Sequence, residues 1–192
     1  MSELQDIFKV PLYKTNLTNI DNKNLAKQCI DFSRKDKGRV ISNVGGYQSS
    51  NIQNVKFVSF LSSSILKACT TFNKDFDLKG SPVLNEMWMN INGYKDNNHT
   101  HNHGATSISG VYYVQTPSKC GPIFFWHPAY DLVSLTYNNK MNNFNAYNSP
   151  RWYLPSEAGL LYLFPGYLNH SVEPNMNKTT KRISISFNVF FK

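Results

Sequence analysis

Histidine is the residue whose placement in this sequence could do chemistry. All five histidines lie between positions 99 and 170, and three of them form the run His99-Thr-His101-Asn-His103. Residues i and i+2 project from the same side of a β-strand, so His101 and His103 could present two imidazoles to one ion. His170 could add a third, and three ligands on one side leave positions open for oxygen and a co-substrate, as non-haem Fe(II) chemistry requires. A solvated surface run and an adventitious metal site remain alternatives for the His99–His103 run.

The fourth candidate, His127, has different surroundings. It follows Phe124, Phe125 and Trp126 and precedes Pro128. A histidine among such neighbours is typically hydrogen-bonded in the core or at its rim, so we leave His127 out of the metal set.

The elements that must position these histidines change character near residue 83. Before it, apolar residues recur at every third or fourth position, which predicts helices over 21–35 and 50–73, after an edge strand at 7–13. After it the period is two, which predicts strands separated by Gly, Pro, Asn and Ser. These strands are expected at 83–92, 108–116, 122–126, 160–164, 170–173 and 182–191.

Short strands with the long helices confined to the N-terminal side predict an α+β, mainly β fold. The expected architecture is a double-stranded β-helix, or jelly roll, buttressed by N-terminal helices. We expect residues 1–192 to form a single domain, with the first strand and the supporting helices over about 1–80 and the jelly-roll core over about 81–192. A chain of this length holds a core without disulfides or a metal, so a metal would be functional.

The composition excludes several classes of protein. No apolar run reaches the roughly 18 residues that cross a bilayer, and the start MSELQDIFKV lacks the features of a secretion signal. Cys29, Cys69 and Cys120 form no CxxC pair and are odd in number, so we expect free thiols. We therefore expect a cytoplasmic protein without a membrane partner. The formal net charge is +8, but no nucleic-acid motif accompanies it, so we expect no nucleic-acid partner.

One predicted strand has an unusually polar face. In the segment 83–92, alternation places Glu86, Trp88, Asn90 and Asn92 on the same side. Such a face either lines a cavity or meets solvent, and the sequence leaves both open.

Four linked motifs in the second half of the chain resemble one family. They are HNHGATSISGVYYV at 101–114, CGPIF at 120–124, GLLYLFPGYLNHSVEPN at 159–175 and RISISFN at 182–188. In order and spacing they resemble the Fe(II)- and 2-oxoglutarate-dependent oxygenases, and most closely a small bacterial and phage branch related to the prolyl hydroxylases. The likeness covers about residues 83–192, with a weaker echo in NVGGYQS at 43–49.

The resemblance implies roles for the histidines. It makes His101 the proximal metal ligand and His170 the distal one, both at the catalytic centre. The family usually has Asp or Glu two positions after the first histidine, where this chain has His103. We expect His103 to be the third ligand, with His99 or a water as the substitute. An imidazole in place of a carboxylate leaves the site one negative charge poorer.

The resemblance also implies an anchor for 2-oxoglutarate. Arg182 stands at the family's position for it, and the planar guanidinium suits a carboxylate. Ser184 faces the same side, Tyr113 resembles the tyrosine that helps to hold the carboxylate, and Asn92, like Asn90, could orient the co-substrate or the target. Packing is the alternative for both asparagines and for Trp88, and an exposed arginine at a strand start is the alternative for Arg182.

The resemblance implies an enzyme. The expected activity is that of a dioxygenase that uses Fe(II), 2-oxoglutarate and O2, with ascorbate as a further reductant. Its expected substrate is a prolyl residue of a protein or peptide, or else a small molecule.

The segment 131–153 is long, irregular and rich in Asn and aromatic residues, which predicts a binding loop or a lid, with disorder as the alternative. The absent carboxylate at position 103 keeps a second hypothesis open, a non-enzymatic jelly-roll binding or structural protein that lost its metal chemistry.

Overall fold

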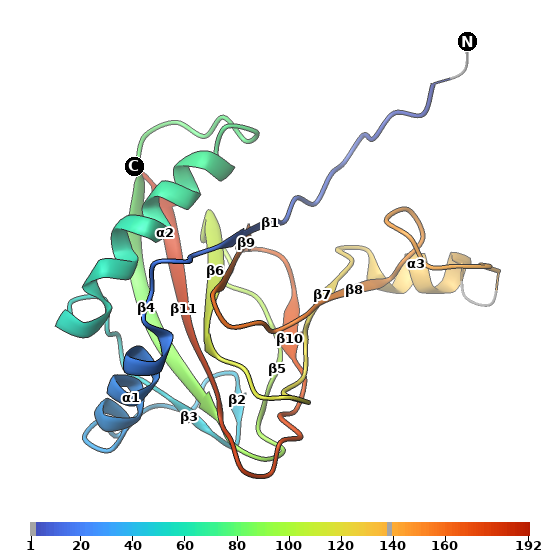
Figure 1. Cartoon of the computed structure of the whole chain (residues 1–192). Coiled ribbons are helices and arrows are strands. Elements are labelled where there is room, and N and C mark those ends of the chain that lie inside the picture. The colour runs from blue at the N-terminus through green and yellow to red at the C-terminus, as the bar shows by residue number, and fades with distance from the viewer. Residues whose placement is uncertain (1–2, 138–139) are drawn as a thin grey trace.

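The computed structural model describes residues 3–137 and 140–192 and contains two antiparallel β-sheets that face each other (Figure 1). The larger sheet consists, in spatial order, of β1 (Tyr13–Asn16), β9 (Leu160–Pro165), β6 (Ile108–Gln115), β11 (Arg182–Phe191), β4 (Pro82–Asn92) and β3 (Tyr47–Gln48). The smaller sheet consists of β2 (Asn43–Val44), β5 (Asn97–His101), β10 (His170–Val172), β7 (Ile123–Trp126) and β8 (Arg151–Leu154). The predicted mainly β jelly roll is confirmed.

Two helices cover the outer face of the larger sheet (Figure 1). Helix α1 (Asn22–Ser33) begins where Asp21 accepts a hydrogen bond from the backbone N–H of Asn24 at 3.0 Å, as an N-cap does. Helix α2 (Ser59–Phe72) follows a short 3-10 turn, η1 (Lys56–Val58). Both helices bury their apolar stripes in one cluster with the outward side chains of the larger sheet. The N-terminal helices therefore support the sheet as predicted.

The second helix starts later than its apolar spacing predicts. Residues 50–55 are not helical; instead the backbone N–H of Ile52 donates to the carbonyl of Met87, and that of Ser49 to the carbonyl of Met89. Ile52 is fully buried because this segment runs beside β4, not because it lies on a helical stripe. The prediction of a helix over 50–73 was wrong for residues 50–55, and residues 56–58 form the 3-10 turn η1. Ile52, Val55 and Val58 repeat at a helical spacing although they do not lie on one helix.

The strands of the second half agree with the predicted ones to within one residue at each end. The predicted strand at 7–13 is wrong, because β1 begins at Tyr13 and Phe8 is 96% exposed. The predicted loop at 131–153 contains part of a helix, α3 (Tyr130–Tyr137), and most of β8; its residues 138–139 lie outside the described residues. The three cysteines are free and buried, as predicted. Across residues 3–137 and 140–192, no helix combines the length and the apolar character that a bilayer crossing needs.

The register of the larger sheet sets which side chains share its inner face. Arg182 lies opposite Asn92, and Ser184 lies between Asn90 on β4 and Tyr113 on β6. Because alternate residues share a face, these side chains lie in successive rows on the side that faces the smaller sheet. The polar face predicted for 83–92 therefore lines the interior between the sheets rather than meeting solvent.

Candidate functional site

A cavity lies between the two sheets, and both of them line it. The larger sheet contributes polar and aromatic side chains, and the smaller sheet contributes histidines and apolar residues. The lining residues include Trp88, Asn90, Tyr113, Arg182, Ser184 and Ser186 from the larger sheet, and Ile123, His170, Val172 and His101 from the smaller one, with His103 from the loop after β5. Strand pairing thus positions most of the lining on both sides of the cavity, with an irregularity of register in each sheet, between His170 and Val172 and between Ile183 and Ser184.

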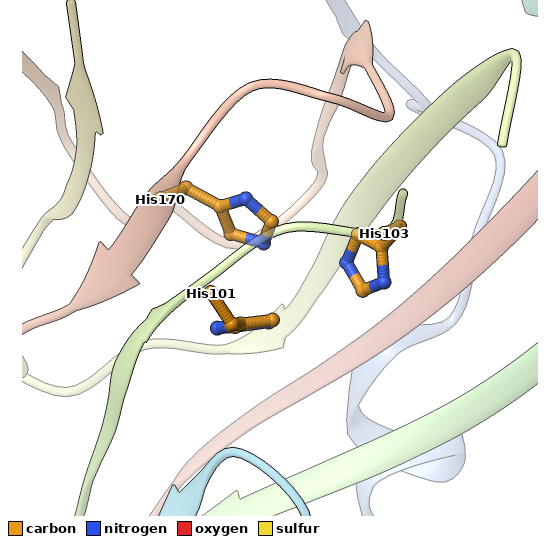
Figure 2. A group of neighbouring side chains, drawn as sticks. All are labelled: His101, His103 and His170. Carbon is orange, nitrogen blue, oxygen red and sulfur yellow. The ribbon is translucent and has the colours of Figure 1, made fainter. Parts of the chain in front are cut away.

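Three histidines meet in this cavity (Figure 2). His101 ends β5 and lies opposite His170, the first residue of β10, while His103 follows β5 by two residues. One ligand atom from each of the three rings lies within 4.8 Å of the others. The ring centroids of His101 and His170 are 4.3 Å apart, and that of His103 is 5.2 Å from the first and 5.1 Å from the second. The structure therefore brings together the three histidines that the sequence singled out.

The other two histidines stand apart from this group. His99 is exposed; its backbone carbonyl accepts from Nδ1 of His101, and its ring lies edge-on to the His101 ring with the centroids 6.1 Å apart, outside the group of three possible ligands. His127 is exposed at the rim, where its Nδ1 accepts a hydrogen bond from the backbone N–H of Ala129 at 3.0 Å. The exclusion of His127 from the metal set agrees with this position.

Backbone carbonyls fix the orientation of two of the three imidazole rings. Nδ1 of His101 lies 2.8 Å from the carbonyl oxygen of His99, and Nδ1 of His170 lies 2.9 Å from that of Leu168. A carbonyl oxygen can only accept, so Nδ1 carries the proton and donates it in both rings. Nε2 of a neutral ring then has a free lone pair, which is how metal-binding histidines are commonly held.

Burial keeps the three imidazoles uncharged. Loss of contact with water lowers the pKa of His103 to about 4, with a further contribution from His101. The same desolvation lowers the pKa of His101 and, more strongly, the pKa of His170. Neutral imidazole is the form that binds a metal, and it suits iron, zinc, copper and nickel. The donor set fits such an ion at neutral pH without a prior loss of protons.

Aromatic rings hold the histidines in place. The Trp88 ring lies 5.5 Å from that of His103, and the Phe164 ring lies 4.7 Å from that of His170 in an edge-on arrangement. Phe125 is also near, at 6.3 Å from His170. Packed rings restrict the side-chain rotamers, so the metal-facing nitrogens are held in place before a metal binds.

A buried cation lies in the same cavity. Arg182 is 1% exposed, and its Nη1 donates to the backbone carbonyls of Cys120 and, at 2.8 Å, of Glu173. Its Nη2 has no partner among the described residues, and neither does the buried hydroxyl of Tyr113. An unpaired buried charge is costly unless an anion completes it. The burial excludes an exposed arginine at a strand start, and the unpaired donors fit a carboxylate.

The remaining predicted residues differ in their placement. Ser184 lines the cavity, one row from Arg182. Asn92 is buried opposite Arg182, and neither its amide nitrogen nor its amide oxygen has a partner among the described residues, but it is not one of the residues lining the cavity. Asn90 does line it, donates to Ser186 at 3.3 Å and leaves its amide oxygen unpaired. The two asparagines therefore have different surroundings although they lie on the same face of β4.

One segment that lines the cavity was not predicted from the sequence. Ser42, in the segment before β2, lines the cavity and accepts a hydrogen bond from Asn98 at 3.2 Å. The pairing of β2 with β5 brings this segment across from the N-terminal part of the chain. The motif echo at 43–49 was the one signal for it.

The comparisons with known proteins agree with this geometry. The family model described as "Putative 2OG-Fe(II) oxygenase" matches residues 86–188. No curated protein sequence matches the chain.

Solved structures share the fold. A prolyl-4-hydroxylase from Pseudomonas putida is 12% identical, with 95% of this chain and 94% of that one covered and a TM-score of 0.66. A prolyl hydroxylase from Trichoplax adhaerens, solved with a peptide fragment of hypoxia inducible factor, is 12% identical at coverages of 94% and 83% and a TM-score of 0.63. A non-haem α-ketoglutarate-dependent epimerase from nogalamycin biosynthesis is 13% identical at coverages of 95% and 79% and a TM-score of 0.64.

Proposed function

The chain belongs to the family of 2OG-Fe(II) oxygenases, whose cofactors are Fe(II) and 2-oxoglutarate, and we propose that it hydroxylates a prolyl residue of a peptide or protein. The observation that supports the oxygenase chemistry is the meeting, in one cavity, of three neutral imidazoles and a buried arginine without a carboxylate partner.

We propose that His101, His103 and His170 hold the metal. With 2-oxoglutarate as the electron donor, bound Fe(II) supplies the activation of O2 that places one oxygen atom on the target and leaves succinate and CO2. The carbonyls of His99 and Leu168 keep Nε2 of their partner rings free for the metal. The close packing of Trp88 and Phe164 restricts the access of water to the reacting centre.

We propose that Arg182 binds the far carboxylate of 2-oxoglutarate. Its guanidinium has a free Nη2, and the Tyr113 hydroxyl is a second unpaired donor in the same cavity. Ser184 supplies a hydroxyl one row nearer to the histidines, and Asn92 lies opposite Arg182 on β4. Charge-assisted hydrogen bonds from a preorganised fork bind a carboxylate more strongly than neutral donors do.

The prolyl target rests on the comparisons. Two of the similar structures are prolyl hydroxylases, and one of them holds a peptide. A third is an epimerase, so the fold by itself does not select a substrate. The prolyl peptide is therefore the finer part of the proposal and needs its own test.

The activity test uses the full chain loaded with Fe(II) under anaerobic conditions. On admission of O2 we expect conversion of 2-oxoglutarate to succinate, slow without a target, and loss of it in His101→Ala and His170→Ala; the exposed His99→Ala is the matched control. A folded, iron-loaded protein that neither binds 2-oxoglutarate nor forms succinate would refute the oxygenase.

The target test uses a proline-containing peptide and the same peptide with alanine at that position. We expect faster succinate formation, and a mass gain of one oxygen atom on the proline, with the first peptide alone. Equal rates with both peptides, and no oxidised proline, would refute the prolyl assignment and leave the oxygenase standing.

His103 favours one alternative function, a binding protein of the same fold without catalysis, because it stands where the family usually has a carboxylate. That alternative predicts that His101→Ala and His170→Ala leave the biological function intact. If His101→Ala and His170→Ala lose succinate formation and the biological function together, the binding-protein alternative is refuted.

A further inference from the structure

Two exposed apolar segments extend from the sheets (Figure 1). The first, the N-terminal arm, comprises residues 3–12 and exposes Leu4, Ile7 and Phe8. The second, the α3 excursion, comprises the described residues 127–137 and 140–150 between β7 and β8; none of the α3 residues is buried, and Leu135 is 79% exposed. Helix α3 packs in part against β7, where the Tyr130 and Trp126 rings are 5.0 Å apart, but Leu132 and Leu135 remain exposed. Helices in folded proteins are stabilised mainly by packing an apolar face, so this side of α3 is open to a partner.

The α3 excursion encloses an open groove beside β8, which we call the β8 groove. It comprises two hollows of about 850 and 290 Å³ that share Ser149, Arg151 and Trp152. Aromatic and apolar side chains line it, among them Phe124, Tyr130, Met141, Phe144, Trp152 and Tyr153. In the described sheet, β8 is an edge strand that pairs with β7 alone. A groove along an open strand edge suits an extended segment, whose backbone can pair with the edge while its side chains fill the hollows.

The exposed area matches that of a stable interface. Phe8, Tyr137, Phe144, Tyr147, Trp152 and Tyr153 are between 41% and 96% exposed. At about 150–250 Å² for each aromatic side chain, these six leave on the order of 700 Å² in contact with water. Monomeric proteins rarely expose so much, whereas a standard interface buries about 800 Å² on each partner. The leucines of the arm and of α3 supply the difference.

The charges of the two segments are complementary. The chain as a whole is +8, so two copies repel each other over most orientations. The arm is an exception: Asp6 pairs with Lys9 at 3.2 Å, which leaves residues 3–12 with one net negative charge, that of Glu3. Among the described residues that line the groove, Arg151 carries the positive charge, with its guanidinium carbon 4.9 Å from the Phe124 ring centre and 5.9 Å from that of Trp126.

The arm meets the groove of its own chain only at Val10 and Leu12, and its residues 3–9 extend away from the body of the molecule (Figure 1). Val10 and Leu12 already form one wall of the smaller hollow. Pro11 restricts Val10 to extended conformations, which opposes a sharp reversal at that point, and Figure 1 shows the arm leaving the body in an outward direction. Ten extended residues span about 33 Å, enough to reach across a neighbouring molecule.

We propose that the chain forms a symmetric dimer in which the N-terminal arm of each copy docks in the β8 groove of the other. The occupant is thus a second copy of this chain, with Phe8, Ile7 and Leu4 as the apolar contacts. The same patch occurs twice in such a dimer, so the exchange is closed and does not lead to filaments.

The test measures the mass of the full chain in solution by light scattering and sedimentation over a series of micromolar concentrations. We expect a dimer for the unmodified chain and a monomer for Phe8→Glu and for Phe144→Glu. The matched control is Phe60→Glu on α2, where the side chain is 45% exposed and far from both segments in sequence; it should remain a dimer. Because Phe8 and Phe144 are exposed, neither substitution removes a buried contact.

Mixing the variants separates arm exchange from other associations. Phe8→Glu keeps its groove and Phe144→Glu keeps its arm, so an equimolar mixture retains one intact arm–groove contact and should form a weaker heterodimer. A chain that stays monomeric at the highest concentration overturns the proposal. This is also the result expected if the arm docks within its own chain. A dimer that Phe8→Glu leaves unchanged overturns the proposal as well.

Discussion

Replacing Arg182 by Met removes the buried charge while keeping most of the volume of the side chain. The guanidinium is 1% exposed, donates to two backbone carbonyls and has one unpaired nitrogen. Truncating one partner of a buried, hydrogen-bonded charge pair costs about 2–5 kcal/mol of binding. At 1.4 kcal/mol per factor of ten, 2-oxoglutarate should bind Arg182→Met about 30- to 4,000-fold more weakly.

The same substitution should lower the stability of the ligand-free protein moderately. Two hydrogen bonds from a charged donor are lost, at about 1.5–3 kcal/mol each. Against this, an apolar side chain no longer carries the desolvation penalty of a buried ion, and such replacements are often neutral or stabilising by about 1–4 kcal/mol. The two effects oppose each other, and mid-range values leave a net loss of about 2 kcal/mol, which in a chain of this size lowers the melting temperature by about 4–8 °C.

The assay is calorimetric titration of 2-oxoglutarate into the metal-loaded protein without oxygen, together with thermal unfolding of the same samples. Arg182→Lys, which keeps the charge but loses the fork, should bind with intermediate affinity. Arg39→Met is the matched control, because Arg39 pairs with Glu86 at 2.6 Å and lies outside the cavity lining. If Arg182→Met folds, holds its metal and binds 2-oxoglutarate within about threefold of the unmodified chain, the assignment of Arg182 is refuted.

Three further predictions concern the histidines and the packing behind them. His103→Asp supplies the missing negative charge and should tighten Fe(II) binding by about tenfold or more, measured by competition with a chelator; weaker binding would show that the imidazole is the better ligand in this cavity. Because the pKa of His103 falls from 6.5 to about 4 on folding, the unfolded chain binds more protons between these values. The free energy of unfolding of the metal-free protein should therefore fall on acidification from pH 6.5 to pH 4, by up to about 1.4 kcal/mol per pH unit from this residue. Denaturant titrations should show a smaller fall in His103→Gln and an unchanged one in His99→Gln. Gly110→Ala places a methyl group 2.7 Å from Cε2 of Phe187 and 2.7 Å from the carbonyl oxygen of Tyr162, which should cost about 1–3 kcal/mol of stability; an unchanged melting temperature would contradict this packing.

The motifs located the candidate site residues, whereas one of the strands that carries them was not predicted. The resemblance of the motifs to a known family pointed to His101, His170 and Arg182 without knowledge of the local structure, and the structure places all three side chains along one cavity. The strand β5, Asn97–His101, was missed because its residues are polar and show no alternation of apolar side chains. It is a strand because its backbone pairs with β2 on one side and β10 on the other, and long-range pairing leaves no periodic signal in five polar residues.

The opposite error occurred at the N-terminal side. Residues 7–13 alternate as a strand does, but Pro11 lacks a donor and the segment pairs with no neighbouring strand before Tyr13. Alternation of apolar and polar residues shows which side chains could share a face. Such a segment forms a strand only where the edge of a neighbouring strand is free to pair with it. In this part of the chain the apolar side chains stay exposed, which is why they are available to another molecule.

The charges inside the cavity connect the two cofactors. Among the described residues lining it, Arg182 carries a charge and no carboxylate accompanies it. A divalent metal bound to three neutral imidazoles adds two positive charges to that one, and a dianion such as 2-oxoglutarate offsets two of the three. Each cofactor should therefore strengthen the binding of the other, and the two effects must be equal, because coupling between binding sites is reciprocal. A carboxylate at position 103 would offset part of the metal's charge in advance and weaken that coupling. As the third ligand that we propose, His103 would shift the site from one that holds its metal alone toward one that holds it best together with the co-substrate.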